Sequence, residues 1–150
     1  MHRNEDESLK HLGPQWYAPT LEDEGGELER TAEDLGINLE ALKKAFEQAQ
    51  LEDLSDEDWV TTINTDSRDE TWTLPAVVAW IKERNTLQSD QPRDVDRVVR
   101  GFESHDRMPA PVILFRQNSS PYCIGGNTRL LVARAKGIKP KVLAIRSSEF

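Results

Sequence analysis

Five residues at positions 125–129, Gly-Gly-Asn-Thr-Arg, combine residue types that proteins use to bind an anion. They follow the apolar run 122–124 and precede a stretch with helical spacing, so we expect them to form a corner between a strand and a helix. The first N–H groups of a helix lack partners within the helix and carry a partial positive charge. Glycines let such a backbone approach a ligand closely. The pattern therefore predicts a turn that binds a phosphate or another oxyanion.

The polar side chains of this turn could add to the backbone donors. Asn127 and Thr128 can each cap the helix or donate a hydrogen bond to an oxyanion. Arg129 is expected in the first helical turn, where a positive charge opposes the helix dipole, and this placement suggests that an anion compensates it. That anion could be a ligand or a carboxylate from the acidic half of the chain. Gly125 and Gly126 could also serve only a tight, closely packed corner.

The residues around the turn predict the elements that hold it. Pro109-Ala110-Pro111 disfavours a helix, and residues 111–124 then have the pattern of a β-hairpin. A helix is expected over residues 127–136, with Gly137 as its C-terminal glycine, followed by a strand over residues 142–145.

Helices are also predicted in the first two thirds of the chain, from apolar spacing and capping residues. Their expected starts are near Glu27, Asn38, Ser55, Thr73 and Arg93. The predicted fold class is therefore α+β, with a helical N-terminal half packed on a small mixed sheet that contains the hairpin, the Gly-Gly turn, its helix and the final strand.

The charge of the chain, −8 overall, is unevenly divided. Residues 1–70 contain 20 acidic and 6 basic residues, whereas residues 71–150 contain 7 and 13. We expect an acidic, flexible tail over residues 1–26, an acidic helical segment over residues 27–72 and an α/β core over residues 73–150. The acidic half could be a solvated surface, or it could mask the basic half by imitating its ligand. Trp16 and Tyr17 could dock a partner or fold back onto the core.

Residues 108–145, MPAPVILFRQNSSPYCIGGNTRLLVARAKGIKPKVLAI, resemble the ParB/sulfiredoxin superfamily, and most closely the small ParB-like domains of phage and plasmid proteins. The shared features are prolines before a strand, the hairpin, the Gly-Gly-x-x-Arg turn, the Ala-rich helix with its glycine and the last strand. The resemblance implies a ParB/sulfiredoxin-like core in which Gly125, Gly126 and Arg129 face nucleotide phosphates. It also implies a nucleoside triphosphate, with Mg²⁺, as the ligand.

The sequence departs from sulfiredoxin at the positions that carry its chemistry. Asn127 stands in place of the catalytic cysteine and Thr128 in place of a histidine, so sulfiredoxin activity is not expected. Cys123 lies in a predicted strand and has the pattern of a small core residue. NTPase, kinase or nuclease activity would be consistent with the resemblance, but no catalytic residue can be named, and whether the protein is an enzyme stays open.

Two further groups of residues could contribute. His105 and Arg107 precede the hairpin and could approach a bound phosphate if the helix over residues 93–105 packs beside the turn, or they could form an exposed helix end. Arg93, Arg97 and Arg100 recur at helical spacing and could contact a nucleic-acid backbone, or they could be a solvated face.

Other classes of function are disfavoured. The histidines, at positions 2, 11 and 105, do not have metal-ligand spacing, so no metal site is expected. No apolar run approaches a membrane span and the first residues do not resemble a signal peptide, so we expect a cytoplasmic protein without membrane partners.

The sequence thus predicts a ParB-like nucleotide- or phosphate-binding protein of phage or mobile-element type, with its ligand at the 125–129 turn. One alternative is an interaction factor that acts on a host or partner protein through the acidic N-terminal half. The other is a nucleic-acid-binding or nuclease-like protein.

Overall fold

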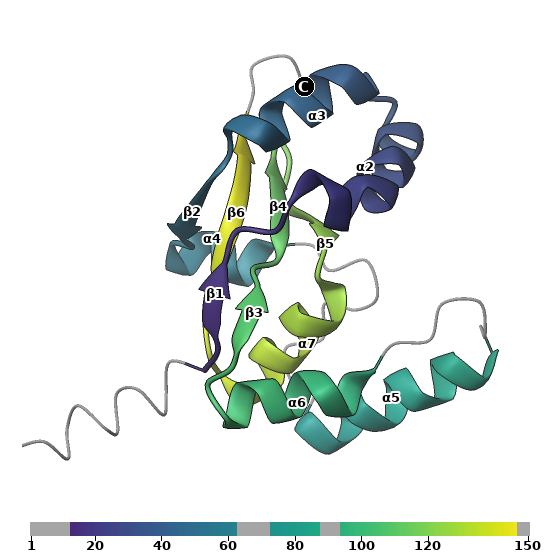
Figure 1. The fold of residues 1–150 in the computed structure, drawn as a ribbon, viewed down its shortest axis with the longest axis vertical. Coiled ribbons are helices and arrows are strands. Elements are labelled where there is room, and N and C mark those ends of the chain that lie inside the picture. Colours follow the sequence, from purple (N-terminus) through teal and green to yellow (C-terminus); the bar gives the residue numbers. More distant parts are fainter. Residues whose placement is uncertain (1–12, 63–72, 88–93, 147–150) are drawn as a thin grey trace, which may run out of the picture.

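The computed structural model describes residues 13–62, 73–87 and 94–146. Within these ranges the chain forms a mixed α+β fold around a four-stranded sheet with strand order β2-β6-β4-β5 (Figure 1). The strands are β2 (Gln50–Asp53), β4 (Val112–Phe115), β5 (Tyr122–Gly125) and β6 (Lys141–Arg146). The predicted α+β class is confirmed at this level.

The C-terminal elements follow the prediction closely. β4 and β5 pair antiparallel as a hairpin, α7 (Asn127–Lys136) follows, and β6 returns parallel to β4. Gly137 ends α7 in the left-handed region with φ 68°, and Ile138 N–H donates to the carbonyl of Ala133 at 2.9 Å. This is the expected glycine-terminated helix end.

Two helices cover one face of the sheet, α2 (Leu21–Leu35) and α3 (Leu39–Gln48). Strand side chains alternate between faces, so one set on β4 and β6 packs against these helices and the other set packs against α7. The first core contains Leu28, Leu42, Phe46, Val112, Leu114, Leu143 and Ile145, all buried. The second contains Leu54, Ile113, Cys123, Leu130 and Val142. Cys123 is therefore a core residue, as expected.

Three more helices belong to the described part of the chain. They are α4 (Asp56–Thr61), α5 (Leu74–Leu87) and α6 (Val95–Glu103). α5 and α6 lie side by side and cover α7 through a third core that includes Val77, Ile81, Phe102, Leu131 and Val132 (Figure 1). Asn38, Ser55 and Asp94 accept backbone hydrogen bonds at helix starts. The cap of α3 by Asn38 and the cap of α4 by Ser55 were both predicted.

The N-terminal region differs from the expected flexible tail. Residues 13–26 contain β1 (Gln15–Tyr17) and the first turns of α2, whereas residues 1–12 lie outside the described residues. β1 pairs parallel with β3 (Arg107–Pro109). The Trp16 ring packs edge-on against Phe102, with ring centres 5.6 Å apart. Trp16 thus folds back onto the core rather than standing free.

The segment over residues 27–72 contains a strand as well as helices. Its residues 50–53 form β2, which pairs antiparallel with β6. This short strand was not predicted, because Gln-Leu-Glu-Asp lacks the β-branched residues typical of strands. In α4, Val60 is 58% exposed and Trp59 is half-buried. Residues 63–72 of this segment lie outside the described residues.

No helix in the described ranges combines the length and the apolar character that crossing a bilayer requires.

Candidate functional site

The Gly-Gly corner lies where β5 meets α7. Gly126 is the N-cap of α7 with φ 87°, and its carbonyl accepts from Leu130 N–H at 2.8 Å. A Cβ at this position would lie 2.9 Å from the Cα of Pro111, so both the backbone angle and the close packing require glycine. The N-cap residue is a glycine and makes no side-chain cap hydrogen bond, whereas Asn127 and Thr128, which were expected as possible caps, lie in the first turn of the helix. The first backbone N–H groups of α7 therefore receive no side-chain cap from the N-cap residue.

A carboxylate from the acidic half lies on this corner. Glu24, in α2, is only 7% exposed, and its Oε1 lies 3.6 Å from Nη2 of Arg129. Its Oε2 lies against Gly125, where an added Cβ would come within 2.3 Å of it. Of the alternatives left open for Arg129, the structure therefore shows a pairing with a carboxylate of the acidic half.

The Glu24–Arg129 pair only partly compensates the burial of the Glu24 carboxylate. Burial raises the pKa of Glu24 above its usual value of 4.5, and Glu27 and Asp23 raise it further, while Arg129 lowers it. A separation of 3.6 Å is longer than the roughly 2.8 Å of a charge-assisted hydrogen bond. Nε and Nη2 of Arg129 are buried without a hydrogen-bond partner among the described residues. The attraction of Arg129 thus only partly offsets the burial of the carboxylate.

Local sequence explains why Glu24 points at the turn. Thr20 and Asp23 form a capping box at the start of α2, each accepting the other's backbone N–H at 3.2 Å. Glu24, Leu28 and Thr31 are all buried and spaced by four and three residues, so they share the helix face that packs on the sheet. The sequence did not single out Glu24, because Gly25 and Gly26 suggested that the helix began later.

The two secondary candidates do not lie at the turn. His105 lines a hollow with Lys136, Gly137 and Ile138, at the C-terminal end of α7. The ten residues of α7 span about 15 Å, which separates this end from Gly126. Nδ1 of His105 lies 2.9 Å from the Gly13 carbonyl.

Arg107 is engaged elsewhere. Its guanidinium carbon lies 5.0 Å from the ring centre of Tyr17. A cation over an aromatic ring at this distance is a favourable contact. Arg107 therefore helps to hold β1 against β3.

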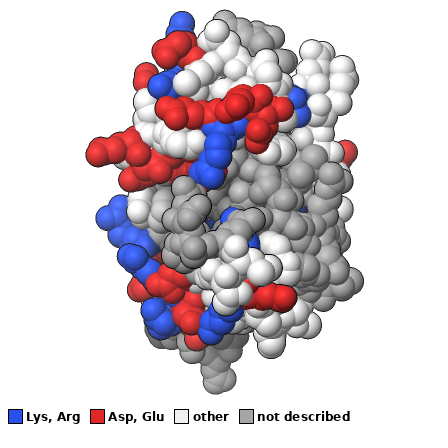
Figure 2. All heavy atoms as spheres, turned by 90° about the vertical axis from the view of Figure 1, so that its right-hand side faces the viewer, with Lys and Arg blue, Asp and Glu red and all other residues white. Residues whose placement is uncertain are grey.

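The arginines proposed as a nucleic-acid face are only partly described. Arg97 and Arg100 are exposed on α6, whereas Arg93 lies outside the described residues. In the lower part of Figure 2, at the level of α5 and α6, basic and acidic side chains are mixed. Asp96, beside Arg97, pairs with Lys82 at 3.2 Å. This mixture weakens the case for a uniformly basic stripe.

Other basic side chains of the C-terminal half pair with the acidic half. Three such pairs lie along the junction of β2, α4 and β6: Lys139–Asp56 at 2.8 Å, Lys141–Asp53 at 3.2 Å and Arg146–Glu52 at 3.0 Å. These pairs are more exposed than Glu24–Arg129, and water screens exposed pairs so that they contribute little to stability. The two halves are thus complementary in charge along a shared boundary.

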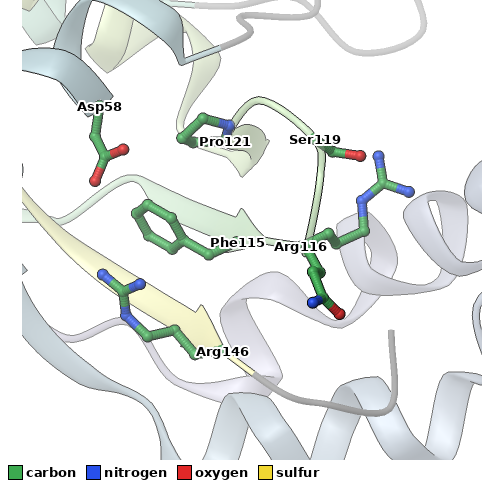
Figure 3. Close-up of a pocket in the computed structure, with 7 residues that line it drawn as sticks. Asp58, Phe115, Arg116, Ser119, Pro121 and Arg146 are labelled. Atoms are coloured by element: carbon green, nitrogen blue, oxygen red, sulfur yellow. The ribbon is translucent and has the colours of Figure 1, made fainter.

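A second hollow, of about 610 Å³, lies at the hairpin (Figure 3). Figure 3 shows Arg146 and Asp58 on either side of the Phe115 ring, with Arg116 and Ser119 pointing the other way. The Arg146 guanidinium carbon lies 4.0 Å from that ring centre. Sequence reasoning missed this hollow, because its residues come from α4, β6 and the hairpin and share no spacing.

Among the described residues, no group of three His, Cys, Asp or Glu side chains is placed to hold a metal ion. No family model, curated protein or solved structure matches the chain. The likeness of residues 108–145 to the ParB/sulfiredoxin superfamily therefore stays a prediction from those residues.

Proposed function

We propose that this protein binds a phosphate-bearing ligand, a nucleotide if the ParB-like resemblance holds, at the turn of residues 125–129. One observation carries the proposal: the buried carboxylate of Glu24 already lies on Gly125 beside Arg129. A site that accommodates one oxyanion between a helix N-terminus and a guanidinium has the chemistry to accommodate another. In the ligand complex a phosphate would take the place of this carboxylate.

Each part of the turn has a role in this proposal. The backbone N–H groups at the start of α7 would donate to phosphate oxygens. Arg129 would supply charge and would donate to phosphate oxygens through Nε and Nη2, which donate no hydrogen bond to Glu24. The half-buried Thr128 would offer its hydroxyl group. The proposal concerns binding and assigns no catalytic step.

Calorimetry with CTP, ATP and GTP, each with and without Mg²⁺, tests the proposal. We expect at least one nucleotide to bind the wild-type protein, and Arg129→Ala to weaken that binding by about tenfold or more, because a charged hydrogen-bond donor is lost. Arg97→Ala, which removes an exposed arginine of α6, is the matched control and should bind like the wild type. The proposal fails if no nucleotide binds, or if Arg129→Ala binds as tightly as the wild type.

A further inference from the structure

We infer that the first turn of α2, residues 21–24, is a latch over the anion site, and that Gly25 and Gly26 are its hinge. The inference rests on the proposed function, because it concerns the regulation of the same turn. In the closed state described above, Glu24 occupies the position of the ligand's anion. Binding then requires the latch to open, so its stability sets the apparent affinity for the ligand.

Glu24 and a bound oxyanion cannot occupy the turn at the same time. Oε2 of Glu24 lies directly against Gly125, and Oε1 faces Nη2 of Arg129. An oxyanion that uses the same backbone and the same guanidinium would occupy the same space. Two negative charges in a site so largely removed from water would also repel each other strongly. Glu24 and a phosphate therefore compete for the turn.

Gly25 and Gly26 lie inside α2, directly after Glu24, and a Cβ at either would meet nothing within 4 Å. Neither has a positive φ, unlike Gly126. Packing and backbone angle therefore do not require glycine here. Compared with alanine, each glycine lowers the equilibrium constant for the helical conformation about fivefold. α2 is therefore least stable between the latch and the rest of the helix.

The rest of α2 is anchored. Leu28 and Ala32 are buried against the sheet, whereas Glu22 and Asp23 in the latch are exposed. Within the latch, Leu21 is partly buried and packs against the core that contains Leu28. The latch can therefore detach at the glycines while Leu28 and Ala32 keep α2 in place.

Calorimetry with inorganic pyrophosphate and with CTP tests the latch in the wild type and four variants. Glu24→Ala should bind more tightly than the wild type, because no side chain competes for the turn. Gly25→Ala combined with Gly26→Ala should bind more weakly, by up to about 25-fold, because the closed helix is stabilised at both positions. In the Glu24→Ala background the two alanines should have no effect. Glu33→Ala, exposed in the anchored part of α2, is the helix-stabilising control and should bind like the wild type.

A measurement on the unmodified protein does not depend on how the variants fold. Saturating pyrophosphate should speed amide hydrogen exchange at residues 23–28, whose N–H groups are bonded within or to the latch, and leave exchange at residues 29–35 unchanged. The latch is wrong if wild-type binding depends on Arg129 but neither Glu24→Ala nor the alanine pair changes affinity by more than twofold. It is also wrong if the alanine pair weakens binding equally in the Glu24→Ala background. If no probe binds any variant, Glu24→Ala included, the proposed function itself fails.

Discussion

Glu24 and Arg129 face each other across the start of α7 at 3.6 Å, with side chains only 9% and 19% exposed. This contact joins the acidic N-terminal half to the predicted anion-binding turn. Because burial raises the pKa of Glu24 despite its cationic neighbour, the charged form of this side chain is disfavoured in the folded protein. The contact thus holds α2 on the turn at an energetic cost that pH can change.

The first prediction concerns pH. The pKa of Glu24 is higher in the folded than in the unfolded protein, so its contribution to stability is greatest below its unfolded value of 4.5 and falls as pH rises through the folded pKa. Glu24→Gln removes this titration. The free energy of unfolding of the variant relative to the wild type should therefore increase from pH 5 to pH 7, measured by urea denaturation. A difference for Glu24→Gln that is constant or falls would contradict the burial argument.

The second prediction separates the roles of the two turn glycines. Gly125→Ala should destabilise the fold by about 1–3 kcal/mol, because its Cβ would press on the Glu24 carboxylate, and Glu24→Ala in the same chain should restore much of the loss. Gly126→Ala meets the backbone of Pro111 and has a positive φ, so Glu24→Ala should not restore it. Chemical denaturation of the two double-mutant cycles measures both effects. Equal rescue of the two alanines would show that the glycines do not differ in this way.

The third prediction concerns His105, which adopts a φ of 55°. Its ring contacts the Gly13 carbonyl, so His105→Ala and His105→Gly both remove this interaction. They differ in backbone cost, since alanine is disfavoured in the left-handed region by about 1 kcal/mol and glycine is not. We expect the glycine variant to have the higher thermal midpoint. An alanine variant at least as stable as the glycine variant would argue that the backbone here relaxes freely.

The fourth prediction concerns Arg134, which joins α7 to the end of α4. Its Nη2 donates to the Thr62 carbonyl at 2.8 Å, and its guanidinium carbon lies 4.7 Å from the ring centre of Trp59. Arg134→Ala should lower the free energy of unfolding by about 1–3 kcal/mol. Arg134→Lys keeps the charge but loses the planar donor group, so its stability should be intermediate. In the Trp59→Ala background, Arg134→Ala should lower the free energy of unfolding by less than it does in the wild type. If the losses of the two single variants simply add, Arg134 and Trp59 are not coupled.

Local patterns predicted the elements that local interactions determine. The hairpin, α7 and the Gly137 helix end follow from turn residues, apolar spacing and a helix-ending glycine, and the structure has them where expected. β1, β2 and β3 are short and depend on partners far away in sequence, so no local signal marks them. α2 was expected to begin near Glu27 because Gly25 and Gly26 suggested a break, yet packing against the sheet extends it to Leu21.

The site shows the same limit. The residue types at positions 125–129 were enough to predict a corner that attracts an anion, and to predict that Arg129 needs one. They could not indicate which of the 20 acidic residues in the first 70 would supply it. That choice depends on the helix face that α2 turns toward the sheet, because Glu24 shares this face with Leu28. Tertiary packing therefore decides the partner of Arg129, and sequence spacing does not.

The pairing of β2 with β6 has a consequence for the order of folding during synthesis. Gln50 lies opposite Ala144, so β2 and the apolar stripes of α2 and α3 leave the ribosome long before the strands that cover them. Leu28, Leu42 and Phe46 must remain exposed to solvent or to chaperones in the meantime. The excess of acidic residues in this half would then keep an incomplete chain from associating with others, since like charges repel before the apolar surface can be buried.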